Sequence, residues 1–191
     1  MRSIQELSLF FMQQGNVYET LRRLARSLER AGIEYSVVGG MALVMHGYVR
    51  ATQDVDLLLS PIGVESFRRE LVGRGFVLAI PGATRMFRDA VTNVIVEILV
   101  AGEFPGDGKP KPVCFPDPAT VAVDRDGIKV IELTKLIELK LASGSAPDRL
   151  KDLADVQELI RTLALKASLV EQLNESVQEQ YMQLWSAINR Q

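Results

Sequence analysis

Two aspartates, Asp54 and Asp56, stand in an otherwise apolar segment that reads DVDLLL. The composition of this segment predicts a strand over residues 54–59, and side chains two positions apart on a strand point to the same face. Their Cα atoms are then about 6.6 Å apart, because a strand rises about 3.3 Å per residue. Such a pair can flank one divalent cation or bridge two, and magnesium binds through one or two carboxylates together with substrate phosphates. The alternative is a solvated strand edge, which the apolar neighbours of the aspartates disfavour.

A glycine pair, Gly39 and Gly40, follows a second apolar segment and precedes residues with good helix propensity. Glycines at a strand-to-helix junction let a phosphate approach the backbone, and the free amides of a first helical turn attract anions. We expect this pair to hold the phosphates of a substrate whose metal is bound by Asp54 and Asp56. A tight turn without a ligand is the alternative.

The composition excludes several other kinds of site. The chain has 191 residues, one cysteine (Cys114), one histidine (His46) and a formal net charge of -2. An intramolecular disulfide, a zinc site of cysteines and histidines, and a relay of two imidazoles are therefore impossible. The charge argues against a generally basic, non-specific nucleic-acid binder, so there is no strong case for DNA. No signal peptide or stretch long enough to span a membrane is present, and we expect a cytoplasmic protein without a membrane partner.

The elements that position these residues follow from periodicity and from glycine and proline positions. We predict helices over residues 3–31, 41–46, 64–72, 135–143 (with Thr134 as N-cap), 147–163 and 168–189. Strands are predicted over residues 34–38, 54–59, 76–80, 85–89, 94–100 and 128–132, with a proline-rich loop over 102–118. This order predicts an α+β fold, or α/β sandwich, with a small mixed sheet flanked by helices. We expect a core with an N-terminal helix over residues 1–133 and a C-terminal helical region over 134–191.

The string GGMALVMHGYVRATQDVDLLL resembles the DNA-polymerase-beta-type nucleotidyltransferase superfamily, and it is most similar to the AbiEii-like and MNT-like branch of toxin–antitoxin systems. The resemblance implies a third metal-binding carboxylate on a later strand, and Glu97 is the matching residue. Members more often have Asp at that position and Gly-Ser in place of Gly39-Gly40. Arg50 and Thr52, which precede the carboxylate strand, become candidates for nucleotide binding.

A downstream segment resembles further motifs of the same branch. It contains Lys140 on one predicted helix, and Asp152 and Asp155 three residues apart on the face of the next. The resemblance implies that Lys140 faces the phosphates and that the two aspartates orient Lys140 or the acceptor. The alternatives are a surface lysine and acidic residues favoured at a helix start.

Together these similarities imply a magnesium-dependent nucleotidyltransferase. Such an enzyme moves a nucleoside monophosphate from a nucleoside triphosphate to a hydroxyl of an RNA, a protein or a small molecule. Two magnesium ions are expected, and manganese is expected to substitute for them. Asp54, Asp56 and Glu97 are the expected catalytic and metal-binding residues, and a cognate toxin or antitoxin chain is a candidate partner. The alternative is a non-catalytic nucleotide-binding or toxin-neutralising protein with the same fold.

Overall fold

The computed structural model of this protein describes residue 10 and residues 14–189. Seven strands in this part of the chain form one mixed sheet with the order β3-β4-β5-β2-β1-β7-β6. The strands are β1 (Tyr35–Val38), β2 (Asp54–Leu59), β3 (Phe76–Leu78), β4 (Met86–Asp89), β5 (Ile95–Val100), β6 (Ala122–Arg125) and β7 (Ile128–Ile131). The helices are α2 (Asn16–Arg30), α3 (Gly39–Met45), α4 (Pro61–Leu71), α5 (Pro118–Val121), α6 (Leu133–Gly144), α7 (Leu150–Thr162), the 3-10 helix η1 (Ala167–Gln172) and α8 (Glu175–Asn189). The predicted α+β class, a small mixed sheet flanked by helices with a helical C-terminal part, is confirmed.

The two faces of the central strands differ in chemistry. On one face Val55 and Val96 are buried together with Phe87 of the neighbouring β4. Phe67 of α4 closes this face, since its ring centroid lies 4.7 Å from that of Phe87. Strand alternation therefore places Asp54 and Asp56 on the opposite face, away from α4.

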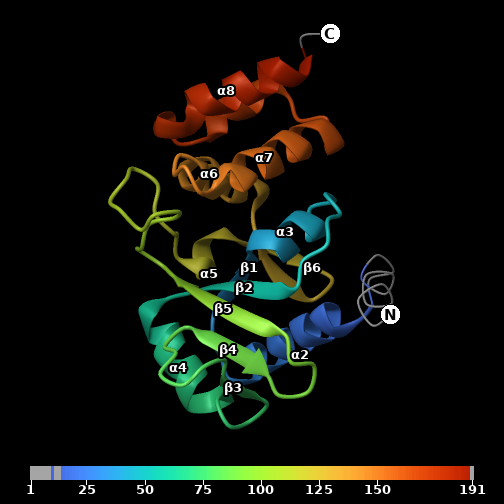
Figure 1. The fold of residues 1–191 in the computed structure, drawn as a ribbon, viewed down its shortest axis with the longest axis vertical. Coiled ribbons are helices and arrows are strands. Elements are labelled where there is room, and N and C mark those ends of the chain that lie inside the picture. The colour runs from blue at the N-terminus through green and yellow to red at the C-terminus, as the bar shows by residue number, and fades with distance from the viewer. Residues whose placement is uncertain (1–9, 11–13, 190–191) are drawn as a thin grey trace.

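The C-terminal helices form a layer at one end of the molecule. Figure 1 shows α6, α7 and α8 stacked above the sheet, while α2 and α4 lie at the other end. Helix α6 is buried along nearly its whole length, from Leu136 to Gly144, because α7 and α8 both pack against it. None of the described helices combines the length and the apolar character that crossing a membrane requires.

Several helix boundaries differ from the prediction, including that of α4, which begins at Pro61 and not at residue 64. The helix predicted over residues 3–31 is interrupted, because α2 begins at Asn16 after Gly15, whose φ is 92°. Phe10 is helical as predicted, and residues 3–9 and 11–13 lie outside the described residues. Thr134 is not an N-cap, because α6 begins at Leu133 and Glu132 takes the cap position. The helix predicted from residue 147 begins at Leu150.

The predicted last helix is two elements. Helix η1 ends at Gln172 and α8 starts at Glu175, so the chain turns at Asn174. The side-chain oxygen of Asn174 accepts a hydrogen bond from the backbone N–H of Ser176 at 3.0 Å, and the backbone N–H of Asn174 donates to Glu138 at 2.7 Å. Asn174 therefore caps the start of α8, which interrupts the helical period.

One strand, β6, is missing from the prediction. It pairs with β7 through a two-residue turn formed by Asp126 and Gly127, whose φ values of 54° and 77° are both positive. Asp-Gly is a favoured sequence for this kind of hairpin turn. The signal was therefore present in the sequence.

Candidate active site

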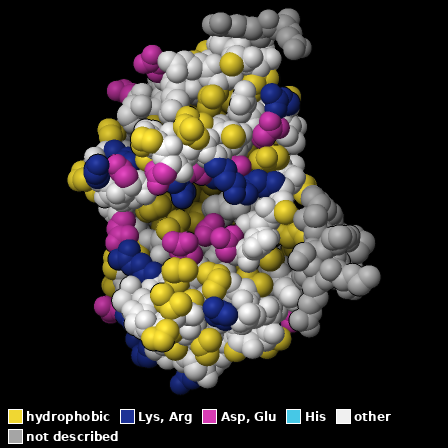
Figure 2. Space-filling model, viewed as in Figure 1, with side chains coloured by type: hydrophobic (Ala, Val, Ile, Leu, Met, Phe, Trp, Pro, Cys, Tyr) yellow, Lys and Arg dark blue, Asp and Glu magenta, His cyan; other side chains and the backbone are white. Residues whose placement is uncertain are grey.

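Three acidic side chains, Asp54, Asp56 and Glu97, lie on one face of the sheet, and we call them the carboxylate cluster. Strands β2 and β5 are parallel neighbours in which Asp56 is paired directly with Glu97. All three line a cleft of about 480 Å³ between the sheet and the C-terminal helices. Figure 2 shows Asp and Glu side chains gathered in this hollow, with Lys and Arg side chains along the opposite rim. The structure thus brings together the three residues predicted to bind metal.

The glycine pair is required by two neighbouring side chains. A Cβ on Gly39 would lie 1.7 Å from Oδ2 of Asp56, and a Cβ on Gly40 would lie 2.6 Å from Oγ1 of Thr52. Gly39 also has a φ of 59°, a conformation that other residues rarely adopt. The space beside these glycines is therefore filled by Asp56 and Thr52, which fixes Asp56 against the first turn of α3.

The carboxylate cluster is electrostatically unfavourable on its own. Burial, and after it the negative charges of Asp54 and Glu97, raise the pKa of Asp56 from 3.8 to about 7. A hydrogen bond from the Gly40 backbone and the charge of Lys140 act in the opposite direction without offsetting the rise. No described residue forms an ion pair with any of these three carboxylates, so no close cation offsets the burial that raises the pKa of Asp56. A bound cation would reverse this effect.

The donor set of the cluster suits a hard cation. Each member offers carboxylate oxygens, and Asp54 is oriented by a hydrogen bond of 2.7 Å from the hydroxyl of Thr52. No group of three or more His, Cys, Asp or Glu side chains among the described residues has the close spacing of a complete metal site. Magnesium needs no complete protein cage, because it retains waters and takes substrate phosphates as ligands. The residues therefore fit magnesium, with one or two carboxylates as protein ligands.

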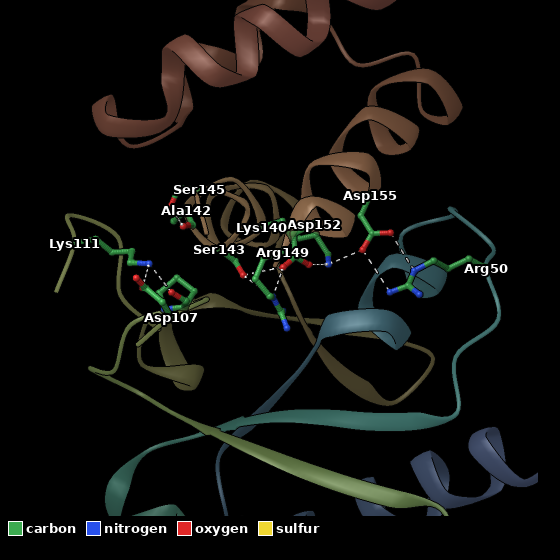
Figure 3. A network of polar contacts seen from close by, with 11 residues as sticks. Arg50, Asp107, Lys111, Lys140, Ala142, Ser143, Ser145, Arg149, Asp152 and Asp155 are labelled. Carbon is green, nitrogen blue, oxygen red and sulfur yellow. Dashed lines mark hydrogen bonds and ion pairs between the residues drawn. The ribbon is translucent and has the colours of Figure 1, made fainter. Parts of the chain in front are cut away.

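On the opposite side of the cleft lies a second charged group, which we call the ion-pair network: Arg50, Lys140, Arg149, Asp152 and Asp155. The ammonium of Lys140 donates to Asp152 Oδ1 at 2.8 Å and to Asp155 Oδ2 at 2.7 Å. All three side chains are buried. Figure 3 shows the contacts between them. The prediction that Asp152 and Asp155 share one helix face and orient Lys140 agrees with this geometry.

Each aspartate of the network also holds an arginine. Nε of Arg50 lies 3.1 Å from Oδ1 of Asp155, and Nε of Arg149 lies 2.9 Å from Oδ2 of Asp152. The hydroxyl of Ser143 donates to the same oxygen of Asp152 at 2.7 Å. Burial by itself raises the pKa of Asp152, but the charge of Lys140 and hydrogen bonds from Lys140 and Ser143 outweigh it, so the pKa is lowered overall.

The remaining predicted residues also line the cleft. Arg50 and Thr52 both lie beside Gly40, since a Cβ on that glycine would be 3.5 Å from an Nη atom of Arg50. Nine of the ten predicted site residues therefore line the cleft; the tenth, Asp155, does not line it but contacts Lys140 and Arg50, which do.

Sequence reasoning missed several cleft residues. Arg149 and Ser143 belong to the wall formed by the helices, and Phe104 and Phe115 of the proline-rich loop form another side. The position of Arg149 three residues before Asp152 on a helix was a readable signal for their ion pair. The loop residues carry no such pattern.

No protein-family model and no curated protein sequence match this chain. Its fold is similar to that of ANT(2″)-Ia, solved in complex with adenylyl-2″-tobramycin, with a TM-score of 0.55 over 86% of this chain and 96% of that one, at 11% identity. The chain has the nucleotidyltransferase fold. Two further structures are similar at 16% identity: a nucleotidyltransferase-like protein from Paracoccidioides brasiliensis, with a TM-score of 0.49 over 75% of this chain and 74% of that one, and JHP933 from Helicobacter pylori, with 0.46 over 80% and 69%.

These likenesses concern the fold. The AbiEii-like and MNT-like branch, which rests on the GGMALVMHGYVRATQDVDLLL string and the downstream motif, stays a prediction. The roles of individual residues rest on the geometry of the cleft.

Proposed function

We propose that this protein transfers a nucleoside monophosphate from a nucleoside triphosphate to a hydroxyl group and that it requires magnesium. The observation that carries the proposal is the carboxylate cluster: three carboxylates on two paired strands, facing a cleft whose other wall is basic. None of the three has a cationic partner among the described residues. A group of acids that disfavours its own charge is suited to a ligand that brings positive charge.

In the proposed reaction the oxygen of the acceptor hydroxyl forms a bond to the α-phosphorus of the triphosphate. The bond from that phosphorus to the bridging oxygen of the β-phosphate breaks, and pyrophosphate leaves. Asp54 and Asp56 would hold the metal and Glu97 would complete its site. Glu97, which is exposed to the cleft, also accepts the proton of the hydroxyl. Bound magnesium, as one ion or two, supplies charge stabilisation to the attacking and leaving oxygens, and manganese is expected to replace it.

The triphosphate is proposed to lie between the turn at Gly39 and Gly40 and the basic wall that includes Arg50. The acceptor is an RNA, a protein or a small molecule, and the branch resemblance adds a cognate toxin or antitoxin chain as a candidate partner. ANT(2″)-Ia was solved in complex with adenylyl-2″-tobramycin, which makes tobramycin one acceptor to include in an assay.

The test is transfer of label from each of the four α-labelled nucleoside triphosphates, with magnesium, to RNA, protein extract and tobramycin, together with pyrophosphate release. Asp54→Asn removes one proposed metal ligand at nearly constant size. Asp126→Asn is the matched control, because Asp126 is exposed, lies outside the cleft and has a positive φ that asparagine tolerates.

We expect transfer with wild type and Asp126→Asn, and loss with Asp54→Asn. Equal activity of Asp54→Asn and wild type would contradict the proposal, as would the absence of label transfer and pyrophosphate release with all four nucleotides. Triphosphate binding without turnover, together with a co-purifying partner chain, would instead support a non-catalytic or toxin-neutralising protein.

A further inference from the structure

The buried lysine of the ion-pair network is poorly placed to bind a phosphate. Lys140 has two of its three possible hydrogen bonds committed to Asp152 and Asp155, at 2.8 and 2.7 Å. Its side chain is 8% exposed. A phosphate that approached the ammonium of Lys140 would be repelled by the two carboxylates that surround it.

Arg149 is placed in the opposite way. Its Nε donates to Asp152 at 2.9 Å and to Ser143 at 3.2 Å, and among the described residues its terminal nitrogens make no hydrogen bond or ion pair. Half of its side chain is exposed, and it lines the cleft that also contains the carboxylate cluster. In Figure 3 its guanidinium points from the helices toward the sheet.

The network therefore holds a guanidinium at a defined place. Arg149 is fixed by Asp152, which is itself fixed by Lys140 and Ser143, so the terminal nitrogens are presented with little freedom to move. A fixed planar guanidinium can bind two phosphate oxygens at once, whereas an ammonium acts as a point charge. Three cations against two carboxylates also leave the network with one net positive charge, which a polyphosphate would neutralise.

We propose that Arg149 binds the triphosphate directly and that Lys140 is a positioning residue that acts through Asp152. This rests on the proposed function, and it assigns the phosphate-facing role to an exposed arginine instead of the lysine. The ligand class is a polyphosphate with its metal, lying between Arg149 and the carboxylate cluster.

The test measures binding of inorganic tripolyphosphate in the presence of magnesium by calorimetry, because this probe is independent of base preference. Arg149→Gln is expected to weaken binding about 10- to 100-fold, the loss of one charge-assisted contact, with partial recovery in Arg149→Lys. Arg161→Gln is the matched control. Arg161 lies in α7, whose N-cap position is taken by Arg149, and it pairs with Glu158 three residues away. Its side chain is 54% exposed against 50% for Arg149, but it does not line the cleft.

A double-mutant cycle separates direct from indirect binding by Lys140. If Lys140 acts through Arg149, Lys140→Met weakens tripolyphosphate binding in the wild-type background and adds no further loss to Arg149→Gln. Additive losses would overturn the positioning role. Should Lys140→Met fail to fold by circular dichroism, Asp152→Asn is expected to show the same lack of additivity with Arg149→Gln.

Equal binding of tripolyphosphate by wild type and Arg149→Gln would overturn the proposal for Arg149 but would not contradict the proposed function. Wild type that binds neither tripolyphosphate nor any nucleoside triphosphate would contradict the proposed function itself.

Discussion

The two sides of the cleft both contain acidic side chains in apolar surroundings, but only one side balances their charge. In the ion-pair network, Asp152 and Asp155 are buried and each contacts a lysine and an arginine. In the carboxylate cluster, Asp54, Asp56 and Glu97 form no ion pair within the part of the chain that the structure describes, and the pKa of Asp56 is raised to about 7.

The difference separates structure from function. A buried acid that is paired with cations belongs to the fold, and removal of one member of the pair lowers the free energy of unfolding. Acids that lack cations cost stability, and such an arrangement is expected where a ligand supplies the missing charge. Substitutions on each side should therefore affect different measurements.

The largest expected effect is on the network. Lys140→Met leaves two buried carboxylates without their shared cation, and we expect the free energy of unfolding to fall by about 3–5 kcal/mol. Urea unfolding followed by circular dichroism measures it. Lys109→Met is the matched control: Lys109 also pairs with an aspartate, Asp107, but its side chain is 81% exposed, so a loss below about 1 kcal/mol is expected. Equal losses for the two variants would contradict the structural role of the network.

The next effect concerns activity on the other side of the cleft. Asp54→Asn is expected to reduce nucleotidyl transfer about 10²- to 10³-fold, since it removes charge that holds the metal at the reacting phosphate. The free energy of unfolding should not fall, because the variant relieves repulsion with Asp56. A loss of stability without a loss of transfer would mean that Asp54 supports the fold and does not hold the metal.

A third prediction uses pH. The folded pKa of Asp56 lies above its unfolded value, so the folded protein binds this proton more tightly and stability from this group falls as pH rises from about 4 to 7. Asp56→Asn should therefore be more stable than wild type at pH 8, by roughly 1–3 kcal/mol, since one pKa unit is worth about 1.4 kcal/mol.

Urea unfolding at pH 5.5 and pH 8 measures this difference, which should be smaller at pH 5.5. Asp126→Asn, at an exposed turn, should follow wild type at both pH values. Magnesium at pH 8 should raise the stability of wild type more than that of Asp56→Asn. If the stability of Asp56→Asn changed with pH as that of wild type does, Asp56 would not be the group whose raised pKa lowers stability at high pH.

Much of the carboxylate cluster was predictable, because its geometry is local. The strand over residues 54–59 has the predicted bounds, and strand alternation alone places Asp54 and Asp56 on one face. Glu97 was found through the family resemblance. Its pairing with Asp56 joins two strands about forty residues apart, and nothing in either segment's own pattern fixes that register.

The network was less predictable, because it depends on how helices pack. Lys140 meets Asp152 and Asp155 across the turn between α6 and α7, and the sequence does not state how deeply that contact is buried. The predicted helix boundaries were wrong where a single residue interrupts the helix, as at Gly15 and Asn174. The exposed guanidinium of Arg149 has no sequence signature beyond its spacing to Asp152.

The smallest effects compare two hydroxyl groups, one on each side of the cleft. Ser143 donates to Asp152 at 2.7 Å, and Thr52 donates to Asp54 at the same distance. Ser143→Ala should lower the free energy of unfolding by about 1–2 kcal/mol, because Asp152 is buried and loses a donor. Thr52→Val should change it by less than about 1 kcal/mol, since Asp54 remains open to water.

The same pair should reverse order when magnesium affinity is measured by calorimetry. Thr52→Val frees the carboxylate of Asp54 to rotate, and loss of an orienting partner weakens metal binding about 10-fold or more. Ser143→Ala leaves the carboxylate cluster untouched and should bind magnesium as wild type does. Equal losses of stability in both variants, with no loss of affinity for magnesium in either, would contradict this comparison. The ion-pair network would then not be the structural side of the cleft, and the carboxylate cluster would not be its metal-binding side.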